Sequence, residues 1–225
     1  MSQFSGDAQE AGIAALERFL RSRLAEPLPG ADAQRRFAPV PLLAGWSPDL
    51  EPPAARRAAA LLLFYPSSLG PTLALTVRHA SLPHHGGQIS LPGGALDPGE
   101  SLEAAATREA EEEIGVTADQ LRVAGALSTL WIPVSNFIVT PFVAVTDERP
   151  AFRLHPREVS ALVEVPLAHL RDPAHIRWAQ RQRLETIVDY PFIAIGDHRV
   201  WGATAMMLSE FLCLFDATHA PPASR

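Results

Sequence analysis

The sequence predicts an α/β protein in which a mixed β-sheet lies between two layers of helices, an α/β/α sandwich. Helical spacing of apolar residues occurs near both ends of the chain, and an alanine-rich helical stretch occurs in the middle. Short apolar runs of strand length lie between them without strict alternation of strand and helix, which favours a mixed sheet. With 225 residues, of which 47% are hydrophobic, the chain can bury one sizeable core.

The first 57 residues are expected to pack on a single domain formed by residues 58–225. Residues 8–24 predict an amphipathic helix, because apolar side chains recur there at helical spacing. The apolar positions are Ile13, Leu16, Leu20 and Leu24. Residues 25–57 contain many prolines, so an extended connection along the surface is expected there and not a second domain.

Two short apolar runs begin the predicted sheet. Residues 58–65 and 73–78 lie on either side of a Ser-Ser-Leu-Gly-Pro stretch, which indicates a hairpin. The later elements are expected to be strands at 121–130, 137–145 and 160–165, a short helix at 167–170, a hairpin at 183–195 and a final helix at 202–215.

Residues 94–116 read GALDPGESLEAAATREAEEEIGV and predict a loop that leads into a helix. The loop contains Asp-Pro-Gly, which is turn chemistry. Ser101 is a suitable N-cap for the alanine-rich run. Gly115 suits the left-handed position after the last helical turn. The chain is organised around this helix.

The predicted helix carries three glutamates on one face. At about 100° per residue, Glu109, Glu112 and Glu113 fall within an arc of roughly 100°, whereas Glu111 points away. Like charges at these spacings destabilise a helix unless a cation neutralises them. Mg²⁺ takes oxygen ligands and is often held by carboxylates and substrate phosphates, so the three glutamates are predicted to hold Mg²⁺ or Mn²⁺. A solvated acidic face is the alternative.

This stretch resembles the signature of the Nudix hydrolases. Gly94, five residues, Glu100, seven residues and then REAEEEIGV from Arg108 fit the signature position by position. The resemblance implies a Nudix-type α/β/α sandwich and a metal-dependent hydrolase. It also implies that Arg108 orients the loop and the first carboxylate.

Residues 75–94 resemble the additional motif of the coenzyme A pyrophosphatase subfamily. His85, Gly87 and Gln88 match this motif, whereas Pro83 stands where the subfamily usually has an arginine. Glycine pairs let backbone N–H groups approach a pyrophosphate closely. The expected substrate-binding residues are Arg78, His85, Gly86, Gly87, Gln88, Gly93 and Gly94. Arg78 or another arginine is expected near the 3′-phosphate of coenzyme A.

Further stretches at 135–141, 156–159, 165–167 and 201–205 resemble the same subfamily, so the resemblance spans about residues 58–215. His155 replaces the asparagine of one subfamily stretch. Glu158 follows it in a loop and is expected to act as a base or extra ligand, the alternative being a solvated glutamate at a strand edge.

The implied reaction is hydrolysis of coenzyme A or a derivative to 3′,5′-ADP and 4′-phosphopantetheine. A bound metal ion lowers the pKa of a water molecule, and Glu112, Glu113 or Glu158 takes its proton. Two alternatives stay open. One is a Nudix enzyme of broader specificity for ADP-ribose, NADH or dinucleoside polyphosphates, and the other is a non-catalytic nucleotide sensor.

Composition limits which other classes of protein and kinds of partner are expected. The net charge of −6 argues against a nucleic-acid surface, and every basic residue apart from histidine is arginine. The single cysteine, Cys213, lies in an apolar helical run, so it is expected to pack in the core. No signal peptide and no apolar run of about 18 residues is found, which predicts a cytoplasmic protein without a membrane partner. Monomer and homodimer are both left open.

Overall fold

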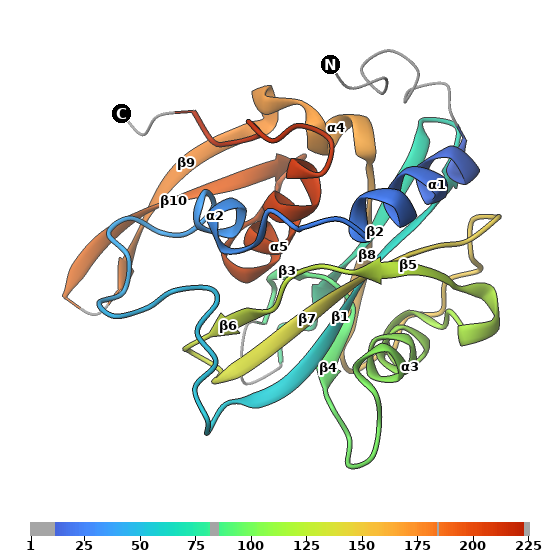
Figure 1. The fold of residues 1–225 in the computed structure, drawn as a ribbon, viewed down its shortest axis with the longest axis horizontal. Helices are drawn as coiled ribbons and strands as arrows, with labels where there is room; N and C mark the ends of the chain where they lie inside the picture. The colour runs from blue at the N-terminus through green and yellow to red at the C-terminus, as the bar shows by residue number, and fades with distance from the viewer. Residues whose placement is uncertain (1–11, 82–85, 184, 223–225) are drawn as a thin grey trace.

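The computed structural model describes residues 12–81, 86–183 and 185–222. A mixed eight-stranded sheet lies at the centre (Figure 1), with the strand order β3-β2-β1-β7-β5 and with β4, β6 and β8 paired to β1, β7 and β2. Its strands are β1 (Arg56–Ser67), β2 (Gly70–Arg78), β3 (Ile89–Ser90), β4 (Gly93–Ala95), β5 (Arg122–Ala126), β6 (Leu130–Ile132), β7 (Phe137–Val145) and β8 (Val159–Pro166). β1 and β7 run parallel and the other pairs antiparallel, which confirms the predicted mixed sheet.

Helices cover both faces of this sheet. The α-helices are α1 (Ile13–Leu24), α2 (Gly30–Arg35), α3 (Leu102–Ile114), α4 (Leu167–Arg171) and α5 (Gly202–Cys213). Short 3₁₀ turns occupy Ala118–Gln120 and Pro173–His175. α3 packs on one face, whereas α1 and α5 pack on the other (Figure 1). The α/β/α sandwich is therefore confirmed.

β1 explains why the molecule has two cores. Alternate residues from Ala58 to Phe64 contact the core beneath α1 and α5, and alternate residues from Ala59 to Tyr65 contact the core beneath α3. Both sets are apolar because a central strand is buried on both faces. The Phe64 ring stacks on Phe211 of α5 with 5.0 Å between the ring centroids, which joins the sheet to the last helix.

A second sheet of three antiparallel strands lies beside the first, in the order β11-β10-β9. Its strands are β9 (Ile176–Arg183), β10 (Thr186–Ile195) and β11 (His198–Val200). The expected hairpin at 183–195 was therefore wrong in its start, because the hairpin pairs β9 with β10. β9 reads IRWAQRQR, and its arginines and glutamines hide the apolar alternation that marks a strand.

Two other expectations need correction. Residues 121–130 contain β5 and the start of β6 and do not form one continuous strand. The connection at 25–57 contains the short helix α2. Leu16 and Leu20 of α1 are 1% and 0% exposed in the core that contains Phe64, so the N-terminal helix packs on the domain.

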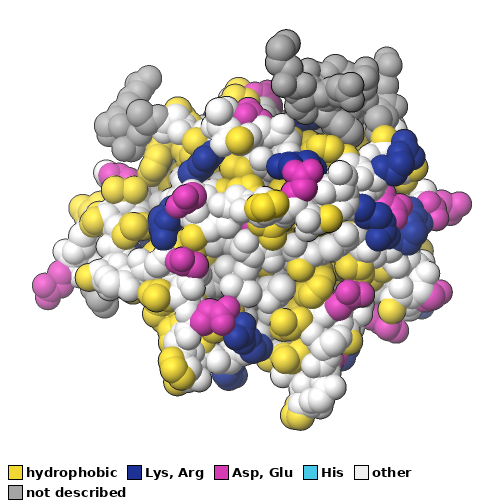
Figure 2. Space-filling view, viewed as in Figure 1, with side chains coloured by type: hydrophobic (Ala, Val, Ile, Leu, Met, Phe, Trp, Pro, Cys, Tyr) yellow, Lys and Arg dark blue, Asp and Glu magenta, His cyan; other side chains and the backbone are white. Residues whose placement is uncertain are grey.

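The surface of the described residues shows mixed charge. On the face in Figure 2, acidic and basic side chains lie interspersed, as expected for a chain with 25 acidic and 19 basic residues. Among the described helices, none is long and apolar enough to cross a membrane.

Candidate active site

The helix α3 begins and ends at the predicted residues. The Ser101 side chain accepts a hydrogen bond from the Ala104 N–H at 3.1 Å, which caps the first turn. Gly115 has a φ of 73°, and its N–H donates to the Glu111 carbonyl at 2.9 Å, which ends the helix. The buried face of α3 packs on β1, so the acidic face has a fixed orientation.

Arg108 connects the loop before α3 to the glutamates of the helix. Its Nε and Nη2 donate to the two Glu100 carboxylate oxygens at 3.0 and 3.2 Å. Its Nη1 donates to Glu109 Oε1 at 2.9 Å and to Glu112 Oε2 at 3.3 Å, and Nη2 also reaches the Ala95 carbonyl at 3.1 Å. The guanidinium fork therefore orients the loop and the first carboxylate.

Gly94 and Gly93 of β4 lie directly beneath this acidic face. A Cβ on Gly94 would stand 2.3 Å from Glu109 Oε1, and a Cβ on Gly93 would stand 2.5 Å from the Ala59 carbonyl oxygen. The Gly93 N–H donates to the Glu113 carboxyl group, so it is already used within the protein. These two glycines position glutamates through close approach of the backbone.

Glu113 is the most buried glutamate of the acidic face, with 2% exposure, and its Oε2 has no hydrogen-bond partner among the described residues. The pKa of Glu113 is raised to about 8, chiefly by burial and to a smaller extent by the negative charges of Glu109 and Glu158. Arg78 Nη1 lies 3.9 Å from Glu113 Oε1 and opposes that rise. Arg78 therefore lies beside the acidic face.

The three predicted ligands differ in exposure. Burial raises the pKa of Glu109, as do the charges of Glu112 and Glu158, while Arg108 lowers it. The Glu112 side chain is 56% exposed and lies at the rim. The structure thus brings Glu109, Glu113 and Glu158 into electrostatic contact, with Glu112 beside them.

The loop that carries Glu158 is tied to α3 by its backbone. The His155 N–H donates to the Glu113 carbonyl at 2.9 Å, and the His79 N–H donates to the Glu158 carbonyl at 2.7 Å. Glu158 is 45 residues beyond Glu113 in the sequence, yet these bonds fix it at the C-terminal end of α3. Its side chain is 45% exposed, which leaves it accessible to solvent.

The loop between β2 and β3 contains the other predicted substrate residues. The Gly87 N–H donates to the Arg78 carbonyl at 2.9 Å, and the Arg78 N–H donates to the Gln88 carbonyl at 2.9 Å. Gly87 has a φ of 75°, which favours glycine, but its N–H is not free for a phosphate. A Cβ on Gly86 would stand 2.7 Å from a backbone oxygen. The predicted contact His85 lies outside the described residues.

Residues 55–186 match the model that describes the NUDIX domain, which is more than half of the chain. The chain belongs to the Nudix family. It is 34% identical over 167 residues to the Nudix hydrolase NudL of Photorhabdus laumondii, covering 72% of this chain and 89% of that protein. Nudix hydrolase 3 of Caenorhabditis elegans is 32% identical over 158 residues, covering 63% of this chain and 66% of that protein.

A solved Nudix structure shows the same fold. The crystal structure of RenU, a Nudix hydrolase from M. smegmatis, has a TM-score of 0.52 and 24% identity. The match covers 76% of this chain and 91% of that one. The Nudix-type fold expected from the sequence is therefore confirmed.

The glutamates of this Nudix domain fit a divalent cation. The buried Glu113 Oε2 lacks a partner, and burial together with neighbouring carboxylates raises the pKa of both Glu109 and Glu113. Oxygen donors with excess negative charge are the ligands that Mg²⁺ and Mn²⁺ take. Within the described part of the chain, no three acidic, His or Cys side chains already converge as a ligand cluster. In the described structure, the Arg108 guanidinium donates hydrogen bonds to Glu109 and Glu112, where a metal ion would bind.

Two residues of the site had no role assigned from the sequence. Glu100 accepts two hydrogen bonds from Arg108, and its fixed place eight residues earlier was the signal for that contact. His155 was noted only as a replacement for asparagine. Its Nδ1 lies 3.4 Å from Glu158 Oε1, a contact that the spacing of three residues permits but does not specify.

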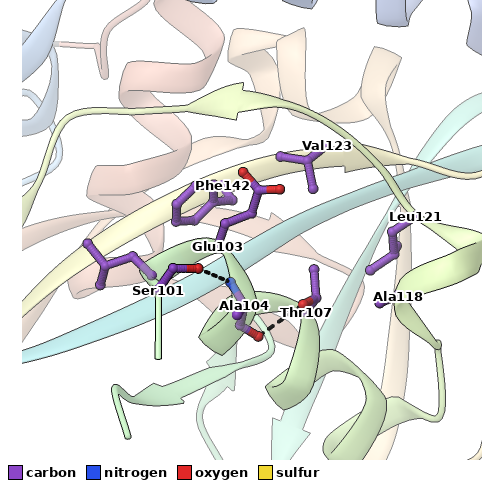
Figure 3. Close-up of a pocket in the computed structure, with 9 residues that line it drawn as sticks. Ser101, Glu103, Ala104, Thr107, Ala118, Leu121, Val123 and Phe142 are labelled. Atoms are coloured by element: carbon purple, nitrogen blue, oxygen red, sulfur yellow. Dashed lines mark hydrogen bonds between the residues drawn. The ribbon is translucent and has the colours of Figure 1, made fainter. Parts of the chain in front are cut away.

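A groove of about 700 Å³ lies elsewhere on α3 (Figure 3). Glu103 and Thr107 line it, whereas Glu109, Glu112 and Glu113 are not among its lining residues. The full lining is Ser101, Leu102, Glu103, Ala104, Thr107, Ala118, Leu121, Val123 and Phe142. The groove is thus separate from the acidic face.

Proposed function

We propose that this Nudix hydrolase cleaves the pyrophosphate bond of coenzyme A or one of its derivatives, giving 3′,5′-ADP and 4′-phosphopantetheine. The observation that carries the proposal is that Glu158, although distant in sequence, lies near enough to Glu109 and Glu113 for its charge to raise their pKa values, on the face of α3 beside Arg78. Buried carboxylates with raised pKa values in an accessible site are typical of catalytic centres. The Nudix relatives support a hydrolase, and the subfamily motif supports the substrate.

Glu109, Glu112 and Glu113 would hold the metal ion. Mg²⁺ or Mn²⁺, when bound, neutralises charge on the phosphate oxygens and lowers the pKa of a bound water. Arg108 keeps Glu109 and Glu112 oriented through its two Nη1 hydrogen bonds. Most of the rate acceleration in this class of reaction comes from positioning and electrostatic stabilisation.

Glu158 is the proposed proton acceptor. Its Oε1 faces His155, which leaves Oε2 to accept a proton from the attacking water. Glu112 and Glu113 were the other candidates from the sequence. Glu113 is nearly inaccessible at 2% exposure, and Glu112 is engaged by Arg108, which favours Glu158.

Arg78 is assigned to the diphosphate and not to the 3′-phosphate. Its guanidinium lies 3.9 Å from Glu113 Oε1, so it can meet negative charge gathered at the acidic face. Gly86 and the predicted contact His85, which lies outside the described residues, remain the candidate diphosphate neighbours, since the Gly87 and Gly93 N–H groups bond within the protein. Another arginine would have to meet the 3′-phosphate.

The test compares kcat/KM for coenzyme A, dephospho-coenzyme A, ADP-ribose and NADH with Mg²⁺ or Mn²⁺, with EDTA as control and products identified by mass. A charge-assisted contact to the 3′-phosphate, worth about 1.5 to 3 kcal/mol, would favour coenzyme A over its dephospho form by about ten- to a hundredfold. With Pro83 at the usual arginine position, that ratio should lie at the low end. A tenfold preference for ADP-ribose or NADH would replace coenzyme A by the broader-specificity alternative, and no metal-dependent cleavage would favour a nucleotide sensor.

A cytoplasmic location stays a prediction.

A further inference from the structure

The turn from His155 to Glu158 connects the Nudix helix to β8 and β2. The His155 N–H donates to the Glu113 carbonyl at 2.9 Å, at the C-terminal end of α3. The Glu158 N–H donates back to the His155 carbonyl at 3.2 Å, and the Glu158 carbonyl accepts from the His79 N–H at 2.7 Å. The backbone of both residues is therefore fixed relative to the acidic face, and what remains adjustable is their side chains.

The His155 side chain has an incomplete contact. Its Nδ1 is buried and makes no hydrogen bond within the described residues. An unpaired buried donor or acceptor destabilises the folded state, so this nitrogen requires a partner in the working enzyme. Glu158 Oε1 lies 3.4 Å away and is the ion-pair partner of the ring in the described chain. Catalytic hydrogen bonds are often long before substrate binds and tighten in the complex.

We infer that His155 is a positioning residue for Glu158, with its Nδ1–H donating to Glu158 Oε1 so that Oε2 points at the attacking water. The inference rests on the proposed function, in which Glu158 accepts the proton. The neutral Nδ1–H tautomer and the imidazolium both have a proton at Nδ1, so the contact needs no change of charge. Without this contact, Glu158 keeps its backbone position but loses a fixed side-chain rotamer.

The chain permits a sharp test by two substitutions at one position. His155→Phe keeps an aromatic ring of similar size and removes both nitrogens. His155→Asn places an amide Nδ2 where Nδ1 stands, and asparagine is also the residue that the subfamily resemblance expects there. His175→Phe is the matched control, because His175 Nε2 lies 3.7 Å from Asp172 Oδ2 at the same spacing of three residues, away from the site.

The measurement is kcat and KM with saturating metal on the best substrate of the panel, with the melting temperature of each variant. We expect His155→Phe to lower kcat about tenfold with KM within about twofold, His155→Asn to restore most of kcat, and His175→Phe to match the wild type. In a Glu158→Gln background, His155→Phe should have no further effect, because coupled residues are not additive. A full tenfold loss in that background, or full activity of His155→Phe, would overturn the inference while leaving the hydrolase function in place.

A second readout does not depend on turnover. In ¹⁵N NMR of the histidine rings, His155 should have a proton at Nδ1, and its resonance should shift in Glu158→Gln but not in Glu111→Gln. An Nδ1 resonance with the same chemical shift in the wild type and in Glu158→Gln would contradict the contact. If no substrate of the panel is cleaved, the proposed function fails, and this spectrum alone still decides whether the two side chains interact.

Discussion

The carboxylate of Glu109 lies directly on the backbone of Gly94, so closely that a Cβ at Gly94 would stand 2.3 Å from Oε1 and 2.4 Å from Cδ. Arg108 Nη1 donates a hydrogen bond to the same oxygen at 2.9 Å. Glu109 is therefore fixed by contacts with a strand and with a guanidinium. Any side chain at Gly94 must move the carboxylate or the strand.

Gly94→Ala should lower kcat by at least about tenfold, because it displaces a predicted metal ligand from its productive position. Metal affinity, measured as the Mg²⁺-dependent rise in melting temperature, should fall in parallel. Gly12→Ala is the control, since nothing lies within 4 Å of the position of its Cβ. Wild-type kcat in the Gly94 variant would show that Glu109 is not needed where it stands.

Glu113→Gln should separate stability from function. Burial disfavours the charged form of Glu113, so the neutral amide should leave the melting temperature in EDTA unchanged or raised. The same change removes a ligand, so the Mg²⁺-dependent rise in melting temperature and turnover should both be lost. Glu112→Gln is expected to retain the fold and lose turnover as well.

Glu111→Gln is the matched control, because it makes the same chemical change on the exposed side of α3. It should keep both the metal response and kcat. A Glu113→Gln enzyme that still turns over and still responds to Mg²⁺ would exclude this face as the metal site.

The local features of the site were predictable and the long-range ones were not. Ser101 and Gly115 cap α3 through contacts within five residues, so sequence spacing alone indicated them. The approach of Gly94 to Glu109 depends on β4, three residues long, pairing with β1. A strand that short has too few residues to show a period of two.

Contacts between distant segments also explain the other differences between the sequence-based expectations and the structure. Glu158 was a candidate from its motif, but its closeness to Glu109 and Glu113 depends on backbone bonds at His155 and His79, which no spacing specifies. β9 was missed because polar residues fill it, and tertiary pairing with β10 overrides its weak apolar pattern.

Glu210→Ala should be among the most destabilising single changes in the molecule. Glu210 is 0% exposed, and its carboxylate accepts from the Gly30 N–H at 3.2 Å, the Ser128 N–H at 3.1 Å and Gln34 Nε2 at 2.8 Å. These bonds join α5 to α2 and to the segment before β6. Removing the carboxylate leaves the Gly30 and Ser128 N–H groups unpaired, whereas Gln34 Nε2 keeps its bonds to the Ser128 and Thr129 carbonyls. We therefore expect a loss of about 3–5 kcal/mol in the free energy of unfolding, measured in urea. A loss below about 1 kcal/mol would mean that the two N–H groups find other partners.

Cys213→Ala should affect stability and not catalysis. The sulfur is buried, with the side chain 3% exposed at the end of α5, and burial raises the pKa of its thiol. A lost buried sulfur should cost on the order of 1 kcal/mol, which lowers the melting temperature by about 2–4 °C for a chain of this size. Turnover should stay within about twofold of the wild type. A folded variant that has lost activity would give Cys213 a role that its position does not explain.

His219 is a buried histidine after α5. It is 8% exposed, its Nε2 has no partner in the described chain, and its ring stacks on Phe37 with 6.3 Å between centroids. Burial lowers the pKa of His219 below its ordinary value, and Arg36 and Arg171 lower it further, while Asp216 opposes them. The folded state therefore binds this proton less readily than the unfolded chain.

The sign of the pH dependence follows from that difference. Above the ordinary pKa of about 6.5, both states are neutral at this position and its contribution to stability is fully present. As the pH falls from there through the lower pKa of the folded state, the unfolded chain takes up the proton first, so stability is lost at up to about 1.4 kcal/mol per pH unit. His219→Gln, which does not titrate, should lose less stability than the wild type between pH 7.5 and 5.5 in urea unfolding. The exposed His198→Gln is the control and should keep the wild-type slope, and an equal slope in His219→Gln would show that this histidine is free to protonate in the folded protein.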